Sequence, residues 1–397
     1  MPVSSPHVAG LASTFKDVEG YSYDFGTHLI TNRLAGTLGI EQDCQDVAYF
    51  GESVFLRGRA YAYPFGLAAV PRYSWSALKA RLGGRPDDGR IDAAAWAEAT
   101  LGTELAREVA IPLLEGLTGA PAEELSPAIG GKLPGVLHTF YLRAIGRLTR
   151  KAVAIGYCQD PPESAAVWHA YPKDGIATVC RHLVGDLDGA VRLRTPVQKI
   201  IVQDDAVTGV EVGGEVQPAA AVISTAPVNV LPRLVVGTDR LEHLARFRYS
   251  TMAFVNLFLR GRNLMPNVAV WFPEDRYDFF RVQEPPIALP ATAPAGHTYL
   301  TVDIGCTVGD TVWQESDDAL AERCLRGGAA GLQPVDRRPR PDQRRAQRRI
   351  RAHLDGGCVP SHRPPRRPRV GRSGGRRMMR SAMEAPAGAT RRPALLG

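Results

Sequence analysis

Residues 9–15 of the chain read AGLASTF, and after a short gap residues 20–28 read GYSYDFGTH. Small side chains at four positions of the first stretch let its backbone come close to another group. A loop of this kind presents free N–H groups, which suit the oxygens of a diphosphate. An ordinary glycine-containing loop has the same composition, so the rest of the chain has to decide between the two interpretations.

The hydrophobic period changes near residue 190 and predicts a series of strands. Residues 191–195 alternate between apolar and polar, as a half-buried strand does. Two more strands are expected over 197–202 and 207–212, joined by a short turn. The continuous apolar run 219–224 predicts a strand that is buried on both faces. Further strands are expected over 254–259, 268–272 and 298–304.

The region between 71 and 189 is expected to be mainly helical. Ala, Leu, Arg and Glu, which favour helices, dominate residues 75–118, and a second helical stretch is expected over 134–150. Near the start of the chain, apolar residues at helical spacing predict a helix over 27–38. Residues 57–64 alternate and predict a hairpin.

The charge of the chain is unevenly distributed. Its 397 residues carry a formal net charge of +7, and 44% hydrophobic with 22% charged residues is ordinary for a globular protein of about two domains. This composition excludes collagen, a coiled coil and a wholly disordered chain. Residues 331–397 hold 18 Arg, no Lys and 4 acids, a charge of +14, so residues 1–330 carry 7 − 14 = −7.

The Arg- and Pro-rich end has no apolar period, so it is not expected to form a packed core. Three explanations stay open: a solvated tail, an arm that binds nucleic acid, or out-of-frame translation of a GC-rich gene. The composition favours the last of these. No aromatic residue follows Trp313, and without stacking partners a nucleic acid is not an expected ligand.

Motifs for metals, disulfides and nucleophiles are missing from the sequence. The six cysteines are too scattered for a zinc ribbon, and no HExxH, GxSxG or phosphate-binding P-loop occurs. We therefore expect no metal, and no catalytic residue can be named. The sequence lacks a long apolar span and a signal peptide, which predicts a cytoplasmic location and leaves peripheral membrane contact open.

In their order and spacing, several short motifs resemble the flavin-dependent amine-oxidase superfamily. Members of this group include protoporphyrinogen oxidase, phytoene desaturase, monoamine oxidase and UDP-galactopyranose mutase. Residues 9–11 (AGL) resemble the Gly-Gly-Leu turn of the family, one glycine short, and residues 24–28 (DFGTH) match its Asp-x-Gly stretch. Residues 168–176 (WHAYPKDGI) resemble its Tyr-Pro-x-x-Gly segment, and residues 222–227 (VISTAP) its return to the flavin domain. The protoporphyrinogen-oxidase-like branch fits best.

The resemblance implies FAD as the cofactor and an α/β fold, α+β in the substrate domain. It divides the chain into a remnant of the FAD-binding domain (1–70), a helical substrate-domain insert (71–189), FAD-domain strands (190–236), a substrate-domain sheet (237–312) and the Arg/Pro-rich tail (313–397). The residues expected near the cofactor are Ala9, Gly10, Leu11, Ala12, Asp24, Gly26, His28, Val197 and Ala226. For His28, a structural role is favoured by the sequence alone, because no partner is identifiable.

Two parts of the family pattern are missing from this sequence. The first βαβ unit, with GxGxxG and an acidic residue for the ribose, is not found, nor is the late glycine-rich motif beneath the flavin ring. The FAD-binding domain is therefore expected to be an incomplete Rossmann-like domain. An open sheet edge of this kind predicts low stability and aggregation.

The resemblance implies an oxidoreductase that transfers hydride from a small-molecule substrate to the flavin. A non-redox flavin isomerase of the UDP-galactopyranose mutase type is the alternative, and Arg57, Arg59 and Arg72 could bind its diphosphate. A non-enzymatic protein that binds nucleic acid through the basic tail and an inactive fragment also stay open. The substrate, electron acceptor and oligomeric state are not given by the sequence.

Overall fold

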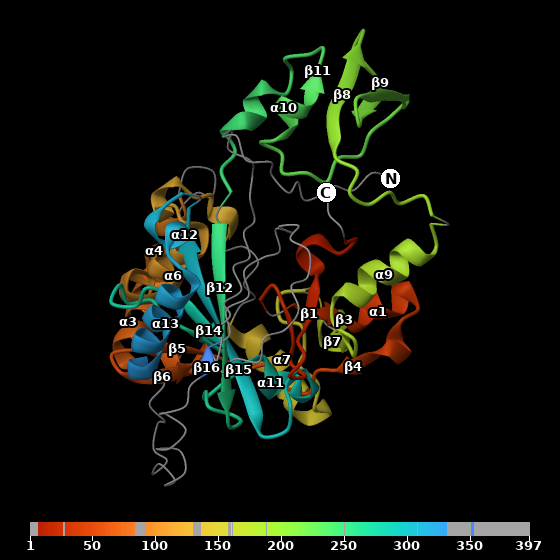
Figure 1. Cartoon of the computed structure of the whole chain (residues 1–397). Helices are drawn as coiled ribbons and strands as arrows, with labels where there is room; N and C mark the ends of the chain where they lie inside the picture. Colours follow the sequence, from red (N-terminus) through yellow and green to blue (C-terminus); the bar gives the residue numbers. More distant parts are fainter. Residues whose placement is uncertain are drawn as a thin grey trace.

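The computed structural model describes residues 7–26, 28–83, 92–129, 136–157, 160, 162–187, 189–249, 251–307, 309–331 and 351–352. Figure 1 shows a long sheet flanked by helices on one side and by a smaller group of strands and helices on the other, with a separate lobe above them. The mixture of helices with mixed and antiparallel sheets confirms the predicted fold class, α/β with an α+β part.

The largest sheet has seven strands in the order β16-β12-β15-β14-β13-β5-β6. Its pairs are antiparallel except for β13 with β5, which are parallel. Leu56 pairs with Arg59 in the predicted hairpin, which is confirmed. The strands are β5 (Glu52–Leu56), β6 (Arg59–Ala62), β12 (Thr251–Arg260), β13 (Ala269–Trp271), β14 (Arg281–Gln283), β15 (His297–Cys306) and β16 (Arg351–Ala352).

The two faces of this sheet are chemically different. On β15, Leu300, Val302 and Ile304 point to one face and join the main hydrophobic core. Because side chains alternate along a strand, the residues between them point to the other face. Helix α13 (Asp317–Gly331) packs on the apolar face, where its Leu320 is fully buried.

A group of helices covers the far end of the sheet, as the composition of this region predicts. Tyr73 is buried from α3, and Ala97 is buried from α4 behind the Asp92 cap, whose side chain accepts the Ala95 N–H. The elements are α2 (Phe65–Ala68), α3 (Pro71–Leu82), α4 (Ala93–Leu101), α5 (Thr103–Leu105), the π-helix η3 (Ala106–Ala110), α6 (Ile111–Thr118), η4 (Ala122–Glu124), η5 (Pro127–Ile129) and α7 (Val136–Thr149).

The start of the chain packs against the other face of the large sheet. The predicted helix over 27–38 is shorter than expected: Ile30 pairs in a strand, Thr31 caps the helix, and α1 begins only at Asn32. The elements here are η1 (Gly10–Ala12), β1 (Thr14–Lys16), β2 (Ser22–Asp24), β3 (Ile30–Thr31), α1 (Asn32–Leu38), η2 (Glu41–Asp43), β4 (Cys44–Asp46), α8 (Glu163–Ala166), β7 (His169–Pro172) and α9 (Ala177–Gly185).

The upper lobe carries a four-stranded sheet in the order β10-β9-β8-β11. The predicted strands over 197–202 and 207–212 are confirmed, and both residues of their turn, Asp204 and Asp205, have the positive φ that such a turn needs. The elements are β8 (Val197–Gln203), β9 (Ala206–Val212), β10 (Glu215–Pro218), α10 (Leu231–Leu234), β11 (Val235–Val236) and η6 (Glu242–Arg246).

Two strands predicted for this part of the chain are wrong. Residues 191–195 contain a single bridge residue, Arg192, followed by a turn at 193–194, where Arg194 has a φ of 51°. The run 219–224 is irregular and largely exposed; Ile223 is 95% exposed. A strand buried on both faces needs a neighbour to pair with, and among the described residues the backbone ladder ends at Ala219, whose N–H bonds to Thr208.

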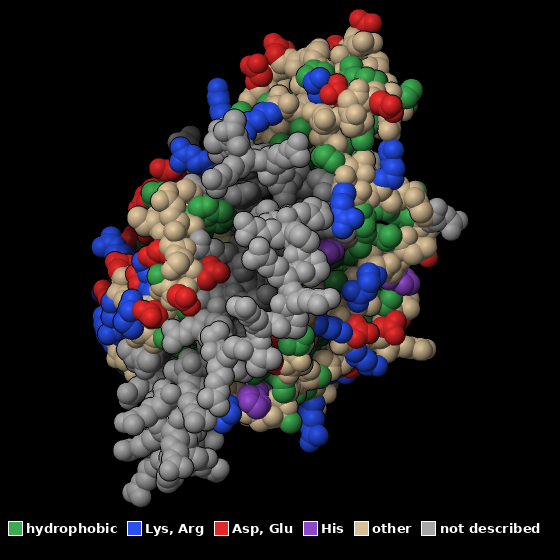
Figure 2. All heavy atoms as spheres, in the orientation of Figure 1, with side chains coloured by type: hydrophobic (Ala, Val, Ile, Leu, Met, Phe, Trp, Pro, Cys, Tyr) green, Lys and Arg blue, Asp and Glu red, His purple; other side chains and the backbone are tan. Residues whose placement is uncertain are grey.

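Apolar side chains also remain exposed on α9, where Ala177 is the buried residue of the helix. Figure 2 shows hydrophobic side chains gathered over this helix, at the right of the molecule. Leu183 and, just after the helix, Leu187 belong to the exposed set. These two leucines and Ile223 of the upper lobe are exposed, whereas the apolar side chains of the main sheet are buried.

The remaining helices lie near the end of the described part of the chain. Helix α13 falls within the range predicted for the tail, and its Cys324 is buried in the main core. Apart from residues 351–352, the range after 331 lies outside the described residues. None of the helices in the described ranges is long and apolar enough to cross a membrane. These elements are α11 (Pro285–Ala288), η7 (Pro290–Thr292) and α12 (Thr311–Gln314).

Two isoleucines test this distribution of the core. Ile304→Ala removes a buried side chain from the main sheet, and we expect it to lower the free energy of unfolding by about 2–5 kcal/mol. Ile223→Ala changes an exposed side chain and should stay within about 0.5 kcal/mol of the wild type. Denaturant unfolding measures both; equal losses would show that the run 219–224 is buried.

Candidate functional site

A small pocket lies where the start of the chain meets the large sheet. The end of β2 contributes Asp24, the loop after it contributes Gly26 and His28, and β7 contributes Tyr171. The opposite wall comes from α11, the residue after it and β15, through Pro285, Leu289, Tyr299 and Thr301. Three of the residues predicted to lie near a cofactor are therefore brought together.

The carboxylate of Asp24 is the fixed point of this pocket. Its Oδ1 accepts a hydrogen bond of 2.8 Å from the Thr14 hydroxyl, and its Oδ2 one of 2.8 Å from the Tyr171 hydroxyl. The backbone of Ile176, just before α9, also hydrogen-bonds to it. The Ala177 N–H donates to Thr14 Oγ1 at 3.1 Å. Asp24 thus joins β1, β7 and the start of α9.

Burial controls the ionisation of this cluster. It raises the pKa of Asp24 to about 6, although the bonds from Thr14 and Tyr171 favour the charged form. Burial also raises the pKa of Tyr171 and of Tyr299, and the Asp24 charge adds to both increases. Both phenols therefore stay protonated near neutral pH and act as hydrogen-bond donors.

The small-residue turn predicted to approach a diphosphate lies beside this cluster. Residues 10–12 form one turn of 3-10 helix, in which Gly10 has a φ of 51°. The turn's own bonds use the N–H groups of Ala12 and Ser13, so those of Gly10 and Leu11 stay outside them, as at the start of any helix. Ala9 to Ala12 lead directly to Thr14 and hence to Asp24.

Gly26 and Gly175 allow the backbone to come close at two points of the site. A Cβ on Gly26, whose φ is 74°, would lie 3.0 Å from Phe254 on β12. A Cβ on Gly175 would lie 2.2 Å from the side chain of Thr14, which is too close for any other residue. Gly26 thus lies close to the large sheet, and the segment before α9 lies close to β1.

His28 lies at the exposed side of the pocket. Desolvation by the protein around the ring lowers the pKa of His28, and the positive charge of Arg281 lowers it further. A hydrogen bond with the Gly26 backbone acts in the opposite direction and raises the pKa. The imidazole is thus neutral near pH 7. Sequence reasoning named no partner for His28, whereas the structure brings Arg281, some 250 residues later, near it.

The polar face of the large sheet forms the floor beneath these residues. Arg281 on β14 binds the fully buried Asp303 on β15, with Nη2 and Nε at 2.5 and 2.6 Å from Oδ2. Gln283 donates to the same oxygen at 3.2 Å, and Thr301 donates to Asn256 at 2.7 Å. Burial raises the pKa of Asp303, while the Arg281 charge opposes this increase.

These floor residues were missed from the sequence, although a signal was present. Residues 299–304 alternate, with Leu300, Val302 and Ile304 following Tyr299, Thr301 and Asp303. Such alternation is commonly taken to mean that the polar face is in water. Here the face with Thr301 and Asp303 is buried as well, so its polar groups have to pair with one another.

The last two predicted cofactor residues lie in the upper lobe. Val197 begins β8, and Ala226 follows the irregular run after β10. Figure 1 shows this lobe above the group that contains β1, β3 and β7. Of the nine predicted residues, three line the pocket, four lie in the turn that leads to Thr14, and two lie in a separate lobe.

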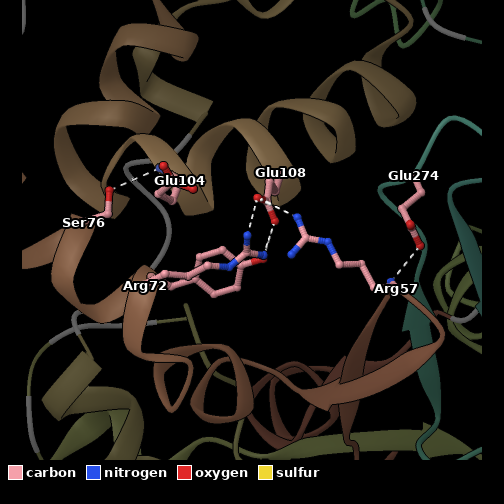
Figure 3. A network of polar contacts seen from close by, with 7 residues as sticks. Arg57, Arg72, Ser76, Glu104, Glu108 and Glu274 are labelled. Atoms are coloured by element: carbon pink, nitrogen blue, oxygen red, sulfur yellow. Dashed lines mark hydrogen bonds and ion pairs between the residues drawn. The ribbon is translucent and has the colours of Figure 1, made fainter.

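The arginines considered for a diphosphate sugar form a different cluster, shown in Figure 3. Glu108 accepts hydrogen bonds from Arg72 at 2.5 and 2.8 Å, from Tyr73 at 2.6 Å and from Arg57 at 3.0 Å. Burial favours the neutral acid, but Tyr73, Arg72 and Arg57 outweigh it and lower the pKa of Glu108. Arg59 lies over the ring of Tyr61. Glu108 thus binds both Arg57 and Arg72, and its single negative charge offsets one of their two positive charges.

The chain as a whole matches a known class of flavoprotein. The model of the family described as flavin containing amine oxidoreductase matches residues 5–342. Because this range is well over half of the chain, the chain belongs to that family of FAD-dependent oxidoreductases. The resemblance predicted from the short motifs is confirmed, and with it FAD as the cofactor.

Solved structures with the same fold include three of particular interest. Reduced UDP-galactopyranose mutase is 18% identical with a TM-score of 0.65, over 82% of this chain and 73% of its own. A putative protoporphyrinogen oxidase from Exiguobacterium sp. 255-15 is 14% identical (TM-score 0.62, coverage 85% and 78%). Cyclohexylamine oxidase from Brevibacterium oxydans IH-35A is 16% identical (TM-score 0.55, coverage 87% and 80%). No curated protein sequence matches the chain.

The raised pKa of Asp24 makes a testable contribution to stability. Between the unfolded value of 3.8 and the folded value of about 6, the unfolded chain loses this proton first. The contribution is therefore fully present below about pH 4 and is lost as the pH rises to about 7. Relative to wild type, Asp24→Asn should gain about 3 kcal/mol over this range, because a tenfold change in proton affinity corresponds to roughly 1.4 kcal/mol.

Urea unfolding of both proteins at several pH values measures this difference. Tyr171→Phe is the control, because it removes a donor to Asp24 but keeps the titrating carboxyl group, so it should keep the pH dependence. A difference between Asp24→Asn and wild type that stays constant with pH would contradict the buried, raised-pKa carboxyl.

Proposed function

We propose that this chain removes hydride from a small-molecule substrate, of the protoporphyrinogen-oxidase or amine-oxidase type, and passes it to FAD. The observation that supports this proposal most is that the small-residue turn at 9–12 and the loop with Gly26 lie beside the buried polar face of the large sheet. When bound, FAD supplies the ring that accepts the hydride, and the protein supplies binding and orientation.

The residues around the pocket fit the middle part of an FAD site. The turn Ala9, Gly10, Leu11 and Ala12 has small side chains at three of its four positions and N–H groups outside its own bonds, which suits phosphate oxygens. Gly26 allows close approach to the loop, and the neutral His28 lies at the pocket's edge. We propose that Val197 and Ala226 contact the cofactor from the upper lobe through their backbone.

Asp24 has a different role within this proposal. Both of its carboxylate oxygens are already bonded, to Thr14 and to Tyr171, so it positions the turn and the loop around them. The floor provided by Arg281, Asp303 and Gln283 is paired internally. It can therefore shield a reacting carbon from water without presenting an unpaired charge to it.

We also propose a cytoplasmic location. The described cysteines Cys44, Cys180 and Cys324 are free thiols, which suits a reducing compartment.

The visible absorption spectrum after incubation with FAD and desalting tests the proposed site. We expect a retained flavin band for the wild type. Gly10→Ala forces a side chain into a backbone with positive φ at the turn and should weaken FAD binding about tenfold, or ~1.4 kcal/mol. Assays with porphyrinogen, amine and polyene substrates then follow for the flavin-loaded protein.

Gly58→Ala is the matched control, because Gly58 also has a positive φ but lies in the β5–β6 turn, where an added Cβ meets nothing within 4 Å. The backbone strain that Gly58→Ala introduces is comparable to that of Gly10→Ala. The FAD affinity of the Gly58→Ala variant should equal that of the wild type. A wild-type protein that stays colourless, or two glycine variants with equal affinity, would refute the site.

A further inference from the structure

Helix α3 exposes an apolar stripe on the side opposite to its buried residue. Tyr73 is the buried side chain of this helix and faces the protein. Trp75, Leu78 and Leu82 follow at intervals of three and four residues, which puts them on one face. They are 59%, 46% and 80% exposed. Figure 1 shows α3 at the left edge of the molecule, far from the upper lobe.

The charge around this stripe has a single sign along the helix. Residues 71–82 contain Arg72, Lys79 and Arg81 but no Asp or Glu. The Lys79 ammonium lies 5.5 Å from the centre of the Trp75 ring, beside the stripe, while Arg72 is bound to Glu108. Two described acids lie beside α3 on neighbouring elements: Glu108 binds Arg72, away from the stripe, and the backbone N–H of Glu104 donates to Ser76 on the flank of the helix.

This combination of residues is typical of a helix that lies in a membrane interface. Trp and Leu on one face insert at the boundary between headgroups and acyl chains, while Lys and Arg at the edge contact anionic headgroups. A protein partner would more often be matched by a mixture of charges around the apolar centre. A surface that binds nucleic acid would be broadly basic and would not carry leucines at its centre.

We propose that the Trp75–Leu78–Leu82 face of α3 binds the surface of an anionic lipid membrane. The helix lies flat on the bilayer, the three apolar side chains enter it, and Lys79 with Arg81 contact phosphate groups. This docking does not require flavin and is independent of the proposed oxidoreductase activity. It would bring apolar substrates dissolved in the membrane close to the protein.

Flotation of the full chain with vesicles tests the proposal. The probes are vesicles of phosphatidylcholine with a third of phosphatidylglycerol, and vesicles of phosphatidylcholine alone. We expect the wild type to float with the anionic vesicles and the double variant Leu78→Ser/Leu82→Ser to bind at least about tenfold more weakly. Lys79→Gln/Arg81→Gln should lose the preference for the anionic vesicles. Tryptophan fluorescence should shift to the blue on binding in the wild type but not in the Leu78→Ser/Leu82→Ser variant.

The matched control is Ile223→Ser, which removes an exposed apolar side chain from the upper lobe and should bind like the wild type. Far-UV circular dichroism confirms that all variants are folded. A wild type that does not float, or equal binding of the wild type and the double leucine variant, overturns the proposal. Self-association of the wild type without vesicles that the leucine variant abolishes also overturns it, in favour of a second copy as the occupant.

Discussion

The buried carboxylate of Asp24 is the constraint on which the candidate site depends. Few interactions of the described chain join so many separate segments: Thr14 of β1, Tyr171 of β7 and the backbone before α9 all bond to it. A carboxyl group in such a place is stable only with its bonds satisfied, because burial penalises its charge. The loop that carries Gly26 and His28 is placed by this anchor.

The second determinant is the difference between the two faces of the large sheet. One face packs Leu300, Val302 and Ile304 into the main core under α13. The other carries Arg281, Asp303 and Thr301, which are paired among themselves and their neighbours. The first face supplies most of the apolar burial, and the second gives the pocket a rigid polar floor. Stability and the proposed chemistry thus use opposite sides of the same strands.

Local periods in the sequence predicted much of this fold, and tertiary contacts explain the rest. The hairpin at 57–64 and the strands over 197–202 and 207–212 follow from alternation and turn residues, which act over a few positions. The strand expected over 219–224 failed because pairing needs a neighbouring strand, which an apolar run does not reveal. The strand expected over 191–195 also failed, because alternation alone does not determine the backbone conformation.

The candidate site was also predicted only in part from the sequence. Ala9 to Ala12, Asp24, Gly26 and His28 were found because they lie within two short motifs near the start of the chain. Tyr299, Arg281 and Asp303 were not, since they are more than 250 residues from Asp24 and reach the pocket only through the sheet register. The resemblance gave the cofactor, whereas the bonds that occupy both carboxylate oxygens of Asp24 are seen only in the structure.

Hydrogen–deuterium exchange with and without FAD tests the central claim most directly, that the turn and the loop beside Asp24 hold the cofactor. The account predicts slower exchange of the amides in residues 9–12 and 24–28 when FAD is present, and unchanged exchange in α3 and α4. Protection confined to other segments, or none at all at saturating FAD, would contradict it.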